Sequence, residues 1–326
     1  MFKLIKYAIF LTIIYYALQY LNNLKVIPSL AFPEDFPKVF TKIATVPSVE
    51  ISQKKQTIAD LIEKIQKNEL RDIQSIWREL GIKSELFKNS QPVLSESFII
   101  DRTSKGDSVY VYKVTDNDSN DWQYLFFNIK NRSWNFYGHI DLPNQALSEP
   151  IARRVMIEDR NWLVITSKIE SPTLSGMYQD QWYDLETSQV KEVLRYYVYQ
   201  DQSGPNFIKR YSATVLETGM IAGSYFIDLD TQIAYLFNSQ TEPETAFSIS
   251  RKVRYLWDHT SQLFKNHNQQ QDNLYNYGAD QILIHNYLLI EELVLNGSPS
   301  QRNRIKGFLR LCKNSPEKKA ILKIIF

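Results

Sequence analysis

The pattern of apolar and polar positions begins with an uncharged run from Tyr7 to Leu24, preceded by Lys3 and Lys6 and closed by Lys25. A bilayer-spanning helix needs about 20 apolar residues. The run reaches that length when the residues before it join the helix and their lysines extend to the lipid headgroups. We therefore predict a signal anchor over residues 1–25, with the amino terminus inside and the bulk of the chain extracytoplasmic.

Two other interpretations of this segment stay open. Ser29-Leu30-Ala31 supplies the small residues that a signal peptidase accepts, and cleavage there would give a secreted protein. Pro28 and the long gap after Leu21 argue against cleavage. The same pattern is also compatible with an amphipathic or core helix of a soluble domain. Lys38 and Lys42 on the far side weaken the charge bias that sets the orientation.

The next two segments differ in their periodicity. Residues 26–52 contain four prolines, which predicts an extended tether. Residues 53–92 carry two runs of apolar side chains at helical spacing, and Gly81 follows the second run. This pattern predicts a helical hairpin. The apolar positions are Ile58, Leu61, Ile62, Ile65, Leu70, Ile73, Ile76, Trp77 and Leu80.

From Val93 to about residue 268 the apolar residues form short β-prone runs separated by polar turns. Aromatic residues are abundant, with 20 Tyr, 17 Phe and 6 Trp, and they favour pleated, half-buried surfaces. The predicted fold class is α+β. A central antiparallel β-meander over residues 93–268 forms a barrel or a two-layer sheet, flanked by the helical hairpin and by C-terminal helices.

A hairpin phrase, in which an acid or amide follows a large apolar residue, recurs within the β region. It occurs at 127–131, 183–187, 227–231 and 257–260. In three of the four, a large apolar residue returns seven positions after the first, at Trp134, Val190 and Phe264. The acids are predicted to form turns. Such phrases are also typical of propeller blades, but the intervals of 56, 44 and 30 residues between phrases are uneven.

Residues 269–326 are predicted to be helical again, with helix caps at Ser298-Pro299 and Ser315-Pro316. One predicted helix has an apolar side that includes Ile305 and Phe308. Its other side is basic and consists of Arg302, Lys306, Arg310 and Lys313. This side is a candidate membrane-surface site, whereas the alternatives are a helix docked on the body by its apolar side or a contact with nucleic acid.

Charge is distributed unevenly along the 326 residues. Residues 301–326 hold eight basic residues and one acid, a net charge of +7; since the whole chain carries +2, residues 1–300 carry −5. Cysteine is limited to Cys312, which excludes an internal disulfide and makes a thiolate metal cluster implausible. With only 10 glycines the chain also has few places for phosphate-binding loops.

Searches for catalytic motifs give little. The sequence has no P-loop, no G-x-G-x-x-G, no G-x-S-x-G and no H-E-x-x-H, and its four histidines are scattered. Asp116, Asp118 and Asn120 match the first, third and fifth ligand positions of an EF-hand loop, which makes Ca²⁺ the candidate cofactor. Asp121 then stands where glycine is needed, so a polar hairpin tip is the competing interpretation.

Two functional hypotheses follow. The first is a membrane-tethered extracytoplasmic binding or assembly module that contacts the membrane through its N-terminal segment and offers surface to a protein, glycan or lipid partner, with no role for nucleic acid. The second is an envelope hydrolase that builds its site from carboxylates distant in sequence, such as Asp184, Asp228 and Glu217. The missing motifs favour the non-enzymatic hypothesis.

Overall fold

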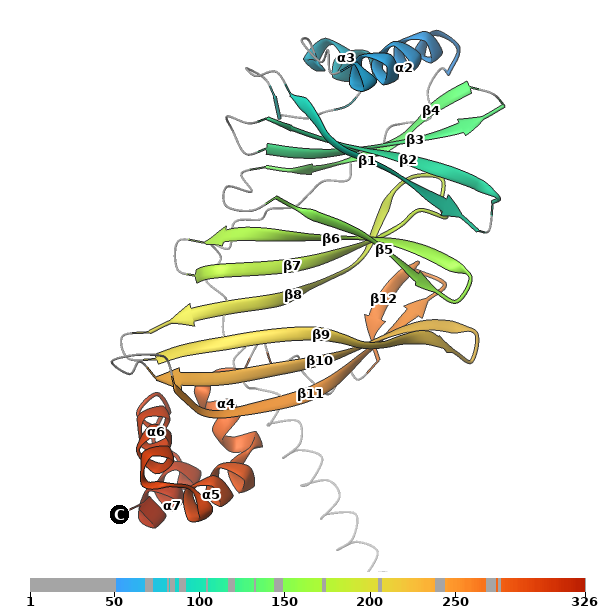
Figure 1. Cartoon of the computed structure of the whole chain (residues 1–326). Helices are drawn as coiled ribbons and strands as arrows, with labels where there is room; N and C mark the ends of the chain where they lie inside the picture. Colours follow the sequence, from blue (N-terminus) through green and yellow to red (C-terminus); the bar gives the residue numbers. More distant parts are fainter. Residues whose placement is uncertain are drawn as a thin grey trace, which may run out of the picture. The chain divides into compact units, whose positions relative to one another are not determined.

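The computed structural model in Figure 1 describes residues 51–325, apart from 68–72, 81, 83–85, 88–91, 104, 117–120, 132, 144–148, 172–173, 205–206, 238–243, 268–273 and 275–276. All described residues belong to one compact unit that spans residues 42–326. The predicted anchor, 1–25, and nearly all of the predicted tether, 26–52, lie outside the described residues. None of the described helices is both long enough and apolar enough to cross a bilayer.

Two helices precede the strands, α2 (Ile51–Gln66) and α3 (Ile73–Leu80). Their apolar positions recur every three or four residues, which gives each helix one apolar side. Ile62 and Trp77 are buried on these sides and belong to the same cluster as Phe127 of the first sheet. This is the predicted helical hairpin, and one face of a sheet covers its apolar side.

The first sheet contains four antiparallel strands in chain order. They are β1 (Val93–Arg102), β2 (Asp107–Asp116), β3 (Asp121–Lys130) and β4 (Ser133–Leu142). Successive side chains of a strand point to opposite faces. Tyr112 and Val114 of β2 therefore pack with the helices, whereas Val109 and Val111 pack with residues of the second sheet.

The second sheet contains eight antiparallel strands, again in chain order. They are β5 (Ile151–Ile157), β6 (Arg160–Ser171), β7 (Leu174–Asp184), β8 (Lys191–Ser203), β9 (Phe207–Ile221), β10 (Ser224–Phe237), β11 (Glu244–Asp258) and β12 (Leu263–Asn266). The predicted fold class, an α+β chain with a central antiparallel meander, is confirmed. Both sheets are open among the described residues, so the strands form neither the barrel nor the equal blades of a propeller.

The tryptophan-rich core shows how the second sheet curls over itself. Trp162 of β6 lies 5.0 Å from Trp257 of β11 and 5.1 Å from Phe264 of β12, measured between ring centroids. Pairing between β8 and β9 is limited to Tyr199–Ser203 with Ile208–Ser212. Beyond that stretch the two strands separate, and side chains from both ends of the sheet share one core.

The hairpin phrase predicts a turn at each of its four positions, and a turn follows the phrase at three of them. Asp184 ends β7 and accepts a hydrogen bond from the Glu186 amide at 2.9 Å; Asp258 ends β11 and accepts from the Thr260 amide at 2.8 Å. The 127–131 phrase precedes the turn between β3 and β4, but its amide, Asn128, is paired inside β3 and does not form the turn. The prediction is wrong at Asp228, which lies inside β10, because its neighbours on β9 and β11 continue the ladder past it.

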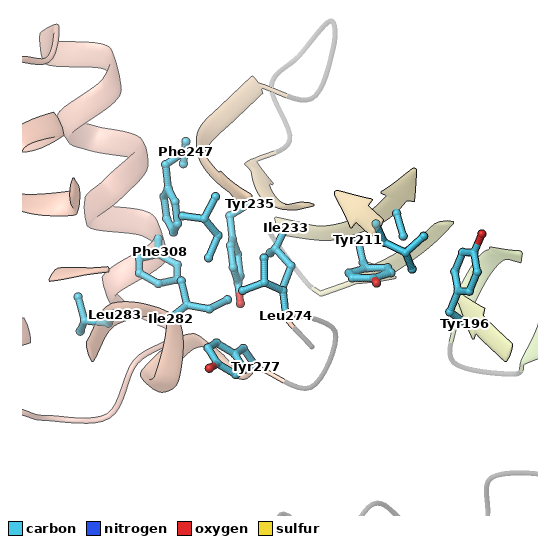
Figure 2. Packing of buried hydrophobic residues seen from close by; sticks show 14 of the residues in the cluster. Tyr196, Tyr211, Ile233, Tyr235, Phe247, Leu274, Tyr277, Ile282, Leu283 and Phe308 are labelled. Carbon is cyan, nitrogen blue, oxygen red and sulfur yellow. The ribbon is translucent and has the colours of Figure 1, made fainter. Parts of the chain in front are cut away.

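Four helices follow the strands in the described C-terminal part: α4 (Ala279–His285), α5 (Tyr287–Asn296), α6 (Pro299–Leu309) and α7 (Pro316–Ile325). Both predicted caps are present, since the Ser298 and Ser315 hydroxyls accept from the Gln301 and Lys318 amides. Asn286 separates α4 from α5, and its side-chain amide donates to the Ile282 carbonyl at 2.9 Å. Figure 2 shows the packing of these helices on the sheet.

Candidate functional site

The outer side of α4 and α5 carries large aliphatic side chains that stay exposed to solvent in the described part of the chain. Ile284 is 52% exposed, Leu288 76%, Leu289 39% and Leu295 55%. We refer to these four side chains as the aliphatic face. Single exposed aliphatic residues are ordinary, but a group of four on two adjoining helices is typical of an interaction site.

The inner side of the same helices explains why the outer side is unusual. Ile282, Leu283, Ile290 and Val294 are buried in the core shared with the second sheet. A helix that needs only to dock on a body requires one apolar stripe, with polar residues on the opposite side. The aliphatic face is therefore not required by the packing of α4 and α5 against the sheet.

The apolar side of α6 is fully used in the core. Phe308 packs against Tyr235 and Phe247 (Figure 2). Its ring centroid lies 4.8 Å from that of Tyr235 and 4.6 Å from that of Phe247, and Ile305 and Leu309 of the same helix are also buried. This helix is therefore docked on the body, which was one of the predicted arrangements. Only its basic side is left to contact a membrane or another partner.

The four predicted basic residues lie on or just after α6. Arg302, Arg310 and Lys313 are exposed, and Lys306 is half-buried. The Arg302 guanidinium donates to the Leu295 carbonyl at 3.0 Å, which places this cation at the border of the aliphatic face. Arg310 and Lys313 follow the end of the helix at Leu309.

The cations of the C-terminal segment differ from the arginines of the β body in their ion pairing. Most arginines of the sheets bind a carboxylate: Arg102, Arg153, Arg160, Arg195, Arg210 and Arg254 each form a salt bridge. Five exposed cations of the C-terminal segment form no ion pair with any acid of the described residues. They are Arg302, Arg310, Lys313, Lys319 and Lys323. Their charge is available to an external anion.

Cys312, the single thiol, lies in the core between the C-terminal helices. Its Sγ approaches the Ala279 carbonyl at 3.6 Å and the Phe308 carbonyl at 3.8 Å. Burial raises the pKa of this thiol to about 12, and the nearby Asp280 carboxylate adds to the effect. A thiol with so high a pKa holds almost no thiolate near neutral pH, so Cys312 is not a nucleophile.

The carboxylates of the hydrolase hypothesis do not converge as a group. Asp184 is fully buried and binds Arg160, with 2.5 Å between Oδ2 and Nη2. Asp228 accepts two hydrogen bonds from Arg254, at 2.7 and 2.6 Å. Glu217 is the cross-strand neighbour of Asp228. The structure therefore brings two of the three acids together, and one of these two is neutralised by an arginine.

The candidate calcium ligands are described only in part. Asp116 is the last residue of β2 and is buried, whereas Asp118 and Asn120 lie outside the described residues. No cluster of three or more His, Cys, Asp or Glu side chains able to hold a metal occurs among the residues with described positions. The calcium site stays a prediction.

Two buried polar groups in the first sheet have no counterpart in the sequence patterns. Lys113 is buried in β2, where its ammonium donates to the Glu149 carboxylate at 2.5 Å and to the Pro150 carbonyl at 2.8 Å. His139 is buried in β4, with Nε2 3.7 Å from Asp141 and Nδ1 without a partner among the described residues. The partners of Lys113 lie 36 and 37 residues further along the chain, whereas Asp141 belongs to the same strand as His139.

Neither a family model, nor a curated protein, nor a solved structure matches this chain. The described surface and the chemistry of its side chains are therefore the features that bear on function. Two features are left unexplained by packing and by ion pairing among the described residues: the aliphatic face, and the five exposed cations on α6, α7 and the turn between them.

Proposed function

We propose that this chain is a membrane-tethered extracytoplasmic binding or assembly module. The observation that carries the proposal is the aliphatic face of α4 and α5, which presents four exposed aliphatic side chains with the Arg302 guanidinium at their border. Exposed apolar groups of this kind, rimmed by polar residues, favour contact with a protein or lipid partner. The uncharged run from Tyr7 to Leu24 and the proline-rich segment after it support tethering at a membrane.

Cell fractionation tests the tether and its side. We expect the full-length chain in the membrane fraction, released by detergent but not by high salt, because an apolar anchor is insensitive to ionic strength. Protease added to intact cells, or to spheroplasts where an outer membrane is present, should digest the body. A shortened chain in the medium or periplasm would indicate cleavage near Ala31 instead. A full-length, freely dissolved cytosolic chain would contradict the proposal.

A hydrolase remains the second candidate because Glu217 and Asp228 are paired across β9 and β10. Side chains in such positions have Cβ atoms about 5 Å apart, so their carboxyl groups can reach the separation of about 5 Å found in retaining glycosidases. The Arg254 guanidinium works against this chemistry, since it occupies both oxygens of the Asp228 carboxylate. Hydrolysis of a glycoside that is lost in Glu217→Gln but not in Glu292→Gln would favour the enzyme.

A further inference from the structure

We propose that the aliphatic face docks on an anionic lipid bilayer, with the cations of α6, α7 and the turn between them held at the lipid phosphates. This inference rests on the proposed function, because a tether keeps the body within reach of the bilayer. It goes further by naming the chemistry of the surface that the C-terminal helices contact.

The arrangement of residues matches what interfacial binding requires. A peripheral membrane site combines aliphatic side chains that enter the boundary of the acyl chains with cations that meet the headgroups. Ile284, Leu288 and Leu295 supply the aliphatic side chains. Arg302 adjoins them through its hydrogen bond to the Leu295 carbonyl. Long cationic side chains can follow the headgroups while their stems cover apolar surface.

The charge balance of the chain favours an anionic partner. Residues 301–326 carry +7, whereas residues 1–300 carry −5, so the cations are concentrated at the C-terminal helices. The five exposed cations named above have no ion-pair partner among the described acids. Each lysine or arginine near an anionic surface contributes to binding, and the contributions add over such a cluster.

Two other occupants fit the same surface less well. Nucleic acid would use the cations, but sites for its bases are built from aromatic platforms, and the aliphatic face contains only Ile and Leu. A second copy of the chain, paired about a twofold axis, would bring two segments of +7 together at one interface. Repulsion between these segments opposes such a dimer.

Glu292 is the exposed acid on the same helix as the aliphatic face, and it works against an anionic bilayer. Its neighbour Glu291 accepts a hydrogen bond from the Tyr287 hydroxyl at 2.8 Å and is half-buried. Neutralising Glu292 should therefore strengthen docking, whereas contact with a basic protein would be weakened by the same change.

A fluorescent label at the centre of the face tests the proposal in the full-length chain. The thiol introduced by Leu288→Cys is alkylated with an environment-sensitive dye. The dye labels this position selectively because Cys312 is buried and its thiol has a raised pKa. The chain is then mixed with vesicles of phosphatidylcholine alone, or of equal parts phosphatidylcholine and phosphatidylglycerol. We expect the emission to shift to the blue, and to be quenched by spin-labelled lipid, only with phosphatidylglycerol and less so at high salt.

Matched variants identify the groups responsible. Arg310→Gln with Lys313→Gln should lower the ratio of docked to undocked label by about thirtyfold, whereas Lys252→Gln, at an exposed lysine of β11, should leave it unchanged. Glu292→Gln should raise it. Helix content measured by circular dichroism confirms that each variant is folded.

The outcomes separate this inference from the tether. If the chain does not bind neutral vesicles, the proposed anchor is absent. The label would still report docking when phosphatidylglycerol is present. If the chain sediments with the vesicles but its label stays in water, the docking inference is wrong and the tether is still supported. A blue shift that depends on protein concentration without lipid, or that is equal on both vesicles, also overturns it, since the occupant is then a second copy or any apolar surface.

Discussion

Arg160 and Asp184 form an ion pair at the edge of the tryptophan core, with 2.5 Å between the guanidinium Nη2 and the carboxylate Oδ2. The Asp184 carboxylate is fully buried, whereas the Arg160 side chain is 18% exposed. The guanidinium also lies 4.5 Å from the ring centroid of Trp162 and 4.9 Å from that of Trp257. One cation therefore satisfies a buried acid and covers the open end of an aromatic cluster.

Replacing Arg160 with alanine should cost about 3–5 kcal/mol of unfolding free energy. The substitution leaves the buried Asp184 carboxylate without its ion-pair partner, and it removes the cation over two tryptophan rings. Urea unfolding followed by tryptophan fluorescence measures the loss. Asp184→Asn should cost less, because Arg160 can still reach water.

Arg254 provides the matched comparison. It also pairs with an aspartate, donating two hydrogen bonds to Asp228 where Arg160 donates one to Asp184, but its side chain is 34% exposed at the surface of the sheet. Arg254→Ala should therefore cost no more than about 1 kcal/mol. Equal losses at Arg160 and Arg254 would show that burial does not set the strength of these pairs.

The fold could be predicted from periodicity because its elements have strong local signals. Alternating aromatic runs predicted the strands, and three of the four hairpin phrases preceded a turn. The phrase that failed, at Asp228, is the one that lacks a large apolar residue seven positions after its first. At Trp257 and Phe264 that spacing brings the two residues into direct cross-strand register. The returning residue therefore carries more information than the acid does.

Contacts between distant segments limited what could be predicted of the candidate site. Residues from 281 to 295 are apolar on nearly all sides, but which of them face outward depends on how α5 packs against α6, α7 and the sheet. Lys113 shows the same limit, since it lies in the buried half of β2 whereas its partner Glu149 comes 36 residues later. Local patterns contain no information about such partners.

His139 should make the chain less stable in mild acid. Burial lowers the pKa of this imidazole, and this effect outweighs the opposing pull of Asp141. In the unfolded chain a histidine titrates near about 6.5. Below that pH the unfolded state binds a proton that the folded state does not, so unfolding becomes easier as the pH falls towards the folded-state pKa. The loss is at most about 2 kcal/mol between about pH 6.5 and pH 5, the limit for one proton.

The substitution His139→Gln should flatten this part of the stability profile. Chemical unfolding at a series of pH values between neutral and mildly acidic compares the variant with the parent chain. His267→Gln is the control, because His267 is exposed and its removal should leave the slope as it is. A parent and a His139→Gln chain with equal slopes would contradict the assignment of the proton uptake to His139.

Phe308 should be the main attachment of the C-terminal helices. Its ring is fully buried between Tyr235 of β10 and Phe247 of β11. Phe308→Ala should cost about 3–5 kcal/mol and speed hydrogen exchange in α4 to α7 before it does so in the first sheet. Leu216→Ala, at an exposed leucine of β9, should stay within about 0.5 kcal/mol of the parent. Similar effects of the two substitutions would contradict the packing role of Phe308.

The Cys312 thiol should react with aromatic disulfide reagents only when the C-terminal helices open. Its pKa of about 12 leaves almost no thiolate at neutral pH, and the surrounding helices exclude the reagent. In the native chain the rate should therefore follow local unfolding, rise in Phe308→Ala and become fast in denaturant. An added Leu288→Cys thiol, at the most exposed position of the aliphatic face, should react at once in the same sample. Equal native rates for the two thiols would mean that Cys312 is not enclosed by the helices.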